Sequence, residues 1–170
     1  MALIEIITNP NPVLRQKARK VTDFGEELQT LIDNMVETMR EAPGVGLAAP
    51  QVNESIRLIV VEYGDDEDED APKKLYTLAN PEIIRFSKET EMGVEGCLSL
   101  PGLVGNVERA SSVTVKALNR HGKPVKIKAS GWLARIFQHE IDHLDGILFV
   151  DRTDEVWTAE EGQVERAPAD

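Results

Sequence analysis

Apolar residues recur at helical spacing in two segments of the chain. In the first segment they fall three or four positions apart, as Leu28, Leu31, Ile32, Met35, Val36 and Met39. Asp23 and Glu26 have the spacing of a capping box ahead of this helix, and Pro43-Gly44 would end it. The pattern predicts an amphipathic helix whose apolar face lies in the core.

The second predicted helix runs over residues 132–144, with Ser130 as its N-terminal cap and Asp145-Gly146 as its stop. Apolar side chains cover much of its circumference, so we expect this helix to be buried among other elements. Runs rich in β-branched residues predict strands at 57–63, 75–80 with a continuation over 81–86, 112–118 and 125–129. The pattern contains no repeat and no domain boundary.

The balance of 41% apolar and 29% charged residues over 170 positions is typical of a globular protein. Much of the formal charge of −11 lies in two segments. Residues 64–74 carry six acids and two lysines, a net −4, and residues 151–170 carry seven acids and two arginines, a net −5, which leaves −2 elsewhere. We interpret both segments as solvated, the first as a loop and the second as a short helix or disordered tail.

These charges also bear on partners and location. Binding to nucleic acid needs clustered lysine and arginine, so no direct nucleic-acid binding is expected. No apolar run approaches a membrane span, and no basic region followed by an apolar stretch opens the chain. We therefore expect a cytoplasmic protein without a membrane partner.

Two histidines four positions apart, His139 and His143, carry the sharpest chemical signal. On a helix these positions share a face, so both imidazoles can reach one metal ion. Glu140 is then placed to act on a metal-bound water rather than to bind the metal. The alternative is a surface helix with two chance histidines. The apolar flanks argue against it, because burying these groups without a metal or partners would be costly.

A catalytic metal site needs a third protein ligand and an open position. Cys97 is the only cysteine and lies in the glycine-containing segment 94–101. Taken alone, it is better interpreted as a buried structural residue. Segment 44–51 combines glycines, which let a backbone approach closely, with the side-chain amide of Gln51. By itself this segment could equally be a turn packed with small residues.

Together the three segments resemble the signature motifs of the peptide deformylase family, in the same order. They are Gly-Leu-Ala-Ala-Pro-Gln at 46–51, Glu-Gly-Cys-Leu-Ser at 95–99 and Gln-His-Glu-Ile-Asp-His-Leu at 138–144. Residues 11–15 and 146–149 are similar as well, so the resemblance covers about residues 6–151. It implies an α+β fold with antiparallel sheets packed around a central metal-binding helix. Residues 1–150 would form a single catalytic domain, followed by the acidic tail 151–170.

The resemblance implies a metal-dependent hydrolase that removes the formyl group from the N-terminal formylmethionine of newly synthesised polypeptides and releases formate. Its metal ligands would be Cys97, His139 and His143. The ion would be Fe²⁺ in the cell, with Zn²⁺, Ni²⁺ or Co²⁺ possible in purified protein, because thiolate suits iron and zinc alike. Glu140 would be the general base, and the Gln51 side chain and the Leu98 backbone N–H would stabilise the oxyanion.

Formylated nascent peptides would be the substrate, with transient contact to the ribosome. Gly44, Val45 and Gly46 would bind the peptide backbone. By position, a slot for the methionine side chain would be lined by Val45, Gly93, Glu95, Trp132, Arg135, Ile136 and His139. Gly93 stands where the commonest bacterial pattern has a larger aliphatic residue, and we expect it to leave room for the Trp132 ring. Val104 is a further departure, at a position that is often basic or aromatic.

Two other functions remain open from the residues alone. A general zinc peptidase shares the histidine-glutamate helix but more often recruits a third histidine or a carboxylate than a cysteine. A protein whose metal only holds the fold would need four protein ligands. Three ligands beside Glu140 favour the hydrolase.

Overall fold

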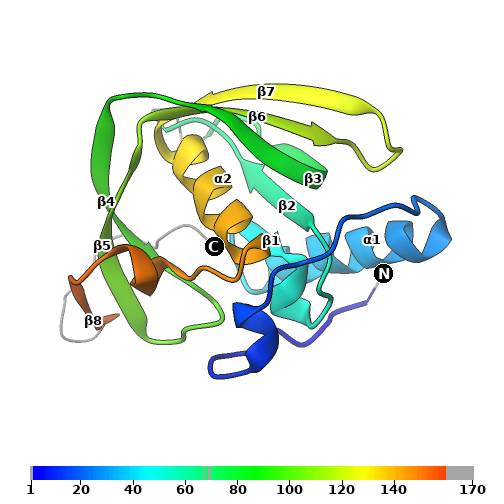
Figure 1. Cartoon of the computed structure of the whole chain (residues 1–170), viewed down its shortest axis with the longest axis horizontal. Helices are drawn as coiled ribbons and strands as arrows, with labels where there is room; N and C mark the ends of the chain where they lie inside the picture. Colours follow the sequence, from blue (N-terminus) through cyan, green and yellow to red (C-terminus); the bar gives the residue numbers. More distant parts are fainter. Residues whose placement is uncertain (1, 67, 69, 160–170) are drawn as a thin grey trace.

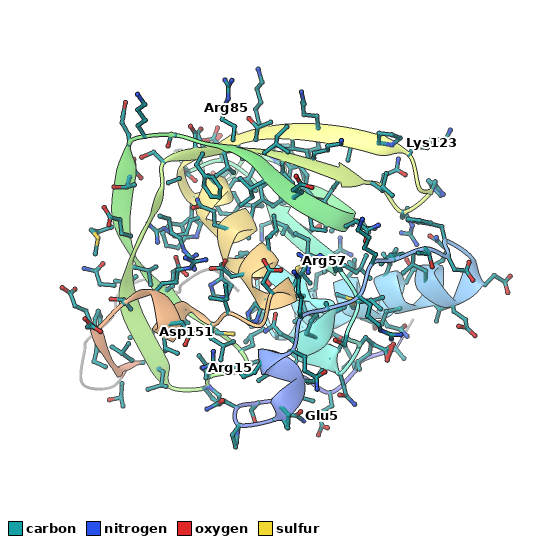
Figure 2. The ribbon with its side chains drawn as sticks, in the orientation of Figure 1. Glu5, Arg15, Arg57, Arg85, Lys123 and Asp151 are labelled. Atoms are coloured by element: carbon teal, nitrogen blue, oxygen red, sulfur yellow. The ribbon has the colours of Figure 1, made fainter. Side chains whose placement is uncertain are left out.

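The computed structural model describes residues 2–66, 68 and 70–159, and its strands form two antiparallel sheets (Figure 1). The larger sheet has the order β1-β2-β3-β6-β7. Its strands are β1 (Gly46–Ala48), β2 (Leu58–Tyr63), β3 (Lys74–Phe86), β6 (Ser112–Leu118) and β7 (Pro124–Ser130). The smaller sheet has the order β4-β5-β8, with β4 (Thr90–Gly96), β5 (Leu103–Ala110) and β8 (Val156–Thr158).

Two α-helices complete the fold, α1 (Glu26–Glu41) and α2 (Gly131–Leu144). Figure 1 shows α2 at the centre of the molecule, with β3, β6 and β7 above it, the β4–β5 hairpin to its left and α1 to its right. Short 3₁₀ turns are found at Pro12–Arg15, Ala49–Val52 and Phe149–Arg152. The predicted α+β class, with sheets around a central helix, is confirmed.

The larger sheet is covered on both faces at β2, which explains the unbroken apolar run in this strand. Leu58 and Val60 pack in the cluster that includes the apolar face of α1. Ile59 and Val61 point the other way, into the cluster that includes α2. Because successive side chains of a strand alternate between faces, a strand buried on both sides is apolar at every position.

Both predicted helix caps differ from the observed ones. Helix α1 begins at Glu26 with Gly25 at the N-cap, and the Asp23 carboxylate accepts a hydrogen bond from the Gly25 N–H at 2.9 Å. Asp23 therefore closes the turn ahead of the helix instead of capping it. Ser130 occupies the N-cap of α2 but makes no side-chain cap hydrogen bond.

Asp66 of the acidic loop makes that hydrogen bond instead. Its Oδ2 accepts from the Trp132 backbone N–H at 3.0 Å, and its Oδ1 accepts from the Tyr63 hydroxyl at 2.7 Å. One residue of the loop that we interpreted as merely solvated thus binds the N-terminal end of the central helix, where a carboxylate is favoured by the free N–H groups and the helix dipole.

Part of the predicted tail is also ordered differently from the expectation. Val156–Thr158 forms β8 and pairs with Leu103–Gly105 of β5, so these residues are neither helical nor disordered. The edge of the β4–β5 hairpin offers unpaired backbone groups that this strand satisfies. The remainder of the predicted tail, from residue 160 on, lies outside the described residues. No helix in the described part of the chain is long and apolar enough to cross a membrane.

Candidate metal centre

The structure brings the three predicted ligands together. One ligand atom from each of Cys97, His139 and His143 lies within 4.8 Å of the other two. Cys97 Sγ is 3.4 Å from His143 Nε2, and all three side chains are buried. Helix α2 supplies the two imidazoles from one face. Cys97 follows the last residue of β4 at the start of a turn, in which its carbonyl accepts from the Leu100 N–H at 2.9 Å.

Glu95 determines which nitrogen of His139 can bind a metal. His139 Nδ1 lies 2.9 Å from Glu95 Oε1. An ionised carboxylate only accepts hydrogen bonds, so Nδ1 carries the proton and Nε2 keeps its lone pair. This carboxylate–histidine arrangement is the usual support of a metal-binding imidazole. The donor set of one thiolate and two imidazoles therefore fits a divalent transition metal such as iron or zinc.

Arg109, which is not among the predicted site residues, holds Glu95 in place. Its Nε and Nη2 each donate to a different oxygen of Glu95 at 2.8 Å, while Nη1 donates to Asp142 at 2.7 Å. Burial would raise the pKa of Glu95, but hydrogen bonds from Arg109 and His139 hold that pKa far below its usual value. Alternation along β5 places Arg109 on the buried face with Val107. A charged residue on an otherwise apolar face is the sequence feature that could have identified it.

Glu140, the predicted general base, lies against the segment that carries β1. Its side chain is fully buried. A Cβ placed on Gly46 would lie 2.6 Å from Glu140 Oε2, too close for any side chain. A glycine at this position therefore lets the backbone of β1 approach the carboxylate, which is the close approach that the glycine-rich motif predicted.

Gln51 is oriented by the same segment. Its Oε1 accepts from the Ala48 N–H at 3.0 Å, which turns the amide NH₂ toward Cys97, one of the candidate metal ligands. Nε2 lies 3.6 Å from Cys97 Sγ and 3.2 Å from Ser99 Oγ. Ser99, a residue of the cysteine motif without a predicted role, is fully buried. Leu98 follows the cysteine directly, so its backbone lies beside the same ligand.

The N-terminal segment ties two of the motifs together. The Ile7 N–H donates to the Gln51 carbonyl at 2.8 Å, and the Asn9 N–H donates to the Ser99 carbonyl at 2.9 Å. These backbone bonds fix the spacing between the glutamine-bearing turn and the cysteine-bearing turn. The ends of distant motifs are thus joined by a third segment that contributes no side chain to the site.

A cavity of about 290 Å³ opens beside Cys97 and Leu98. Its other lining residues are small or apolar and comprise Pro43, Gly96, Leu100, Pro101, Gly102, Leu103, Val104 and Ala159. Val104, one of the departures from the family pattern, is therefore part of a hollow that adjoins Cys97.

Five of the predicted slot residues divide into two groups. Val45 and Trp132 are partly buried and pack against the cluster that contains the fully buried Ile136. Glu95 and Arg135 are buried with their charged ends bonded to each other at 2.6 Å, an arrangement that the slot prediction did not foresee.

The role that we expected for Gly93, to leave room for the Trp132 ring, is wrong. A Cβ at this position would lie 2.7 Å from Arg135 Cζ, so the glycine makes room for the guanidinium and not for the tryptophan ring.

Comparison with known proteins agrees with this geometry. The polypeptide deformylase family model matches residues 3–158. The peptide deformylase of Natranaerobius thermophilus is 53% identical over 95% of this chain and 99% of its own. The crystal structure of peptide deformylase from Thermotoga maritima superposes with a TM-score of 0.84 at 41% identity, covering 91% of this chain and 99% of that one.

A structure with a bound peptide is also similar. The class I type b peptide deformylase from Acinetobacter baumannii, bound to Met-Ala-Ser, has a TM-score of 0.83 and 42% identity, covering 89% of this chain and 99% of that one. The resemblance stated from the motifs is confirmed. The chain belongs to the polypeptide deformylase family, enzymes that remove the formyl group from the N-terminus of polypeptides.

Proposed function

We propose that Cys97, His139 and His143 hold one divalent metal ion at which the formyl group is hydrolysed. The convergence of these three buried ligand atoms within 4.8 Å carries the proposal. When bound, the ion would lower the pKa of a coordinated water and polarise the formyl carbonyl. We assign Fe²⁺ as the ion in the cell and expect Zn²⁺, Ni²⁺ or Co²⁺ to be able to replace it in purified protein, because the mixed donor set suits all four.

Glu140 is the general base in this proposal. It takes a proton from the attacking water and returns it to the leaving amine, which frees formate and the new N-terminus. Three features support the assignment: Glu140 sits next to the first histidine ligand, its carboxylate is fully buried, and it touches the backbone of β1. Burial away from water strengthens its interaction with developing charge.

Gln51 and Leu98 would stabilise the oxyanion. The Gln51 amide is aimed at Cys97 by its bond to the Ala48 N–H, and the donor is therefore oriented before any substrate binds. The backbone N–H of Leu98 lies next in the chain to the cysteine ligand and offers a second donor on the same side.

The substrate peptide would bind along residues 44–46. β1 ends the order of the larger sheet, so among the described residues one of its edges pairs with no other strand, and an added strand could bind there. Gly46 would accept the N–H of the formylated residue, and the Val45 N–H would bind the next carbonyl. The relative bound to Met-Ala-Ser supports a methionine in the first position. Val45, Trp132 and Ile136 would wall its slot, with Gly44 in the approach and the cavity at Val104 beyond it.

The cellular setting follows from that substrate. Formylated N-termini arise on new polypeptides, so we place the protein in the cytoplasm, in transient contact with the ribosome. Co-sedimentation of the protein with ribosomes that carry a formylated nascent chain would test the contact. Recovery that does not depend on the nascent chain, or no recovery, would contradict it.

One experiment tests the central proposal. Protein purified without oxygen should contain about one divalent metal per chain and should release formate from a formyl-methionyl tripeptide. The same peptide without the formyl group should not be cleaved, which separates this activity from that of a zinc peptidase. Metal removal by a chelator should abolish formate release, and Fe²⁺ should restore it. A protein that keeps its rate without metal would refute the assignment.

A further inference from the structure

Arg135 is a buried cation in an unusual position on α2. Its side chain is 5% exposed. Nη1 donates to Glu95 Oε2 at 2.6 Å and to the Val107 carbonyl at 2.9 Å, and Nη2 donates to the Glu91 carbonyl at 2.7 Å. The guanidinium therefore joins the helix to both strands of the β4–β5 hairpin. Because the side chain is buried and makes three hydrogen bonds to the protein, it is a poor candidate for contact with a substrate.

Gly93 is what allows the guanidinium to occupy this place. A Cβ on residue 93 would lie 2.7 Å from Arg135 Cζ and 2.8 Å from Nε. The guanidinium cannot swing aside cheaply, because two strands and a carboxylate hold it. The Trp132 ring also lies against it, with the ring centroid 5.4 Å from Cζ. Arg135 thus fills the space that a larger side chain at residue 93 would take.

The bonds to Glu95 make its two oxygens unequal. Oε1 meets His139 Nδ1 at 2.9 Å and Arg109 Nη2 at 2.8 Å. Oε2 accepts from Arg109 Nε at 2.8 Å and from Arg135 Nη1 at 2.6 Å. Arg109 donates one hydrogen bond to each oxygen at the same distance, so it does not distinguish between them. Arg135 binds Oε2 alone and leaves Oε1 to the histidine.

We propose that Arg135 is a positioning residue for the metal centre. By holding Glu95 Oε2 it keeps Oε1 on the His139 Nδ1–H, so that Nε2 of the imidazole faces Cys97 and His143. Gly93 is its necessary partner. This inference rests on the proposed metal site and adds to it a pair of residues that neither bind the ion nor touch the substrate.

Metal affinity separates positioning from a merely structural role. We would measure Zn²⁺ affinity by chelator competition, the visible absorption of the Co²⁺-loaded protein, and the melting temperature. Arg135→Met keeps an unbranched side chain but removes the guanidinium with every donor, and it should weaken Zn²⁺ binding by about 10- to 100-fold and shift the Co²⁺ bands. Arg135→Lys keeps the charge with one donor nitrogen and should lose less.

A matched control comes from the other side of the molecule. Ile32 is fully buried in the cluster under α1. Ile32→Ala should lower the melting temperature while leaving the Zn²⁺ affinity and the Co²⁺ spectrum at their parent values. If Arg135→Met behaves in the same way, Arg135 only ties the hairpin to the helix and the proposal is overturned.

Gly93→Ala tests the pairing first with the arginine itself unchanged. The added methyl should push the guanidinium away from Glu95 and weaken Zn²⁺ binding in the parent background. In an Arg135→Met background the same substitution should cost little further affinity, because the methionine side chain is not held by hydrogen bonds and can move away from the added methyl. Equal losses in both backgrounds would refute the pairing. A parent protein that binds no metal would instead remove the proposed site itself, which is a distinguishable failure.

Discussion

The two buried regions of this molecule differ in what they enclose. The cluster between α1 and the larger sheet is apolar, and the buried polar residue on α1 is Thr38, whose hydroxyl donates to the Asn34 carbonyl at 2.7 Å. Around α2 the chain buries ten polar or charged residues: Gln51, Glu95, Ser99, Arg109, Arg135, Gln138, His139, Glu140, Asp142 and His143. The first region depends on filled volume. The second depends on each polar group having its partner.

The two regions also differ in how much they stabilise the fold and in which groups they orient. Buried ion pairs seldom stabilise a fold more than apolar side chains of the same shape would. The network around α2 is therefore better explained by what it orients than by the stability it supplies. The apolar region packs α1 against β1 and β2 and so fixes the position of these strands. Hydrogen bonds in the polar region orient the His139 imidazole and the Gln51 amide.

The largest expected effect lies within the polar region. Glu140→Gln should retain the metal and lose nearly all turnover, since the amide keeps the shape of the side chain but transfers no proton. Proton transfer by a positioned base is commonly worth about 10²- to 10⁴-fold. Metal content by elemental analysis and formate release measured on the same sample would check it. A variant with full metal content and near-parent kcat would remove Glu140 from the mechanism.

Removing one side chain from the polar network should lower the free energy of unfolding more than removing a similar volume from the apolar region. Arg109→Met leaves Glu95 and Asp142 buried with fewer partners and should lower the free energy of unfolding by about 3–5 kcal/mol. Its metal affinity should fall as well. Chemical denaturation with and without Zn²⁺ would measure both.

Ile32→Ala is the counterpart in the apolar region. It should lower stability by about 2–5 kcal/mol through the cavity it leaves, with metal affinity unchanged. If Arg109→Met and Ile32→Ala lose stability and nothing else, the two regions do not differ in the way we describe.

A smaller effect tests where the polar region meets the substrate. Trp132 lies at the N-terminal end of α2 and is partly buried. Trp132→Leu should change the ranking of formyl-peptides that begin with methionine, norleucine, leucine or phenylalanine. One methylene in an apolar slot is worth roughly 1–3 kcal/mol, which is visible in kcat/KM ratios. An earlier melting temperature with an unchanged ranking would make Trp132 a core residue only.

The smallest effect belongs to an ion pair at the edge of the α1 region. Arg40 forms a two-pronged pair with Glu62, at 2.9 and 2.7 Å, and this hydrogen bonding lowers the pKa of Glu62 against the raising effect of burial. A lowered carboxyl pKa contributes stability above the ordinary value of 4.5 and loses it as the pH falls toward the folded-state pKa.

Arg40→Leu should therefore reduce stability by less than about 1 kcal/mol, because Arg40 is largely exposed. The difference from the parent should be constant between about pH 7 and 5 and should shrink below pH 4.5. Denaturation at a series of pH values would show it. A difference that persists undiminished at the acid end would mean that the arginine acts through packing.

The sequence by itself determined the local features whose signal lies within a few positions. Helical spacing located both helices, and the i, i+4 histidines located on α2 two of the three residues that could hold a metal ion. Order and content of the three motifs identified the family. The β4–β5 hairpin escaped pattern analysis because Gly93, Gly96 and Gly105 interrupt the alternation that marks strands.

Only the tertiary structure decided which distant groups meet. Asp66 caps α2 from 66 positions away, Arg109 and Arg135 share Glu95, and Gly93 makes room for a guanidinium instead of an indole. None of these pairs is marked by spacing along the chain, because a hydrogen bond or a steric gap depends on where two backbones lie in space. The local sequence pattern specifies which interactions a side chain can make. The packing of the two sheets around α2 specifies the partners with which it makes them.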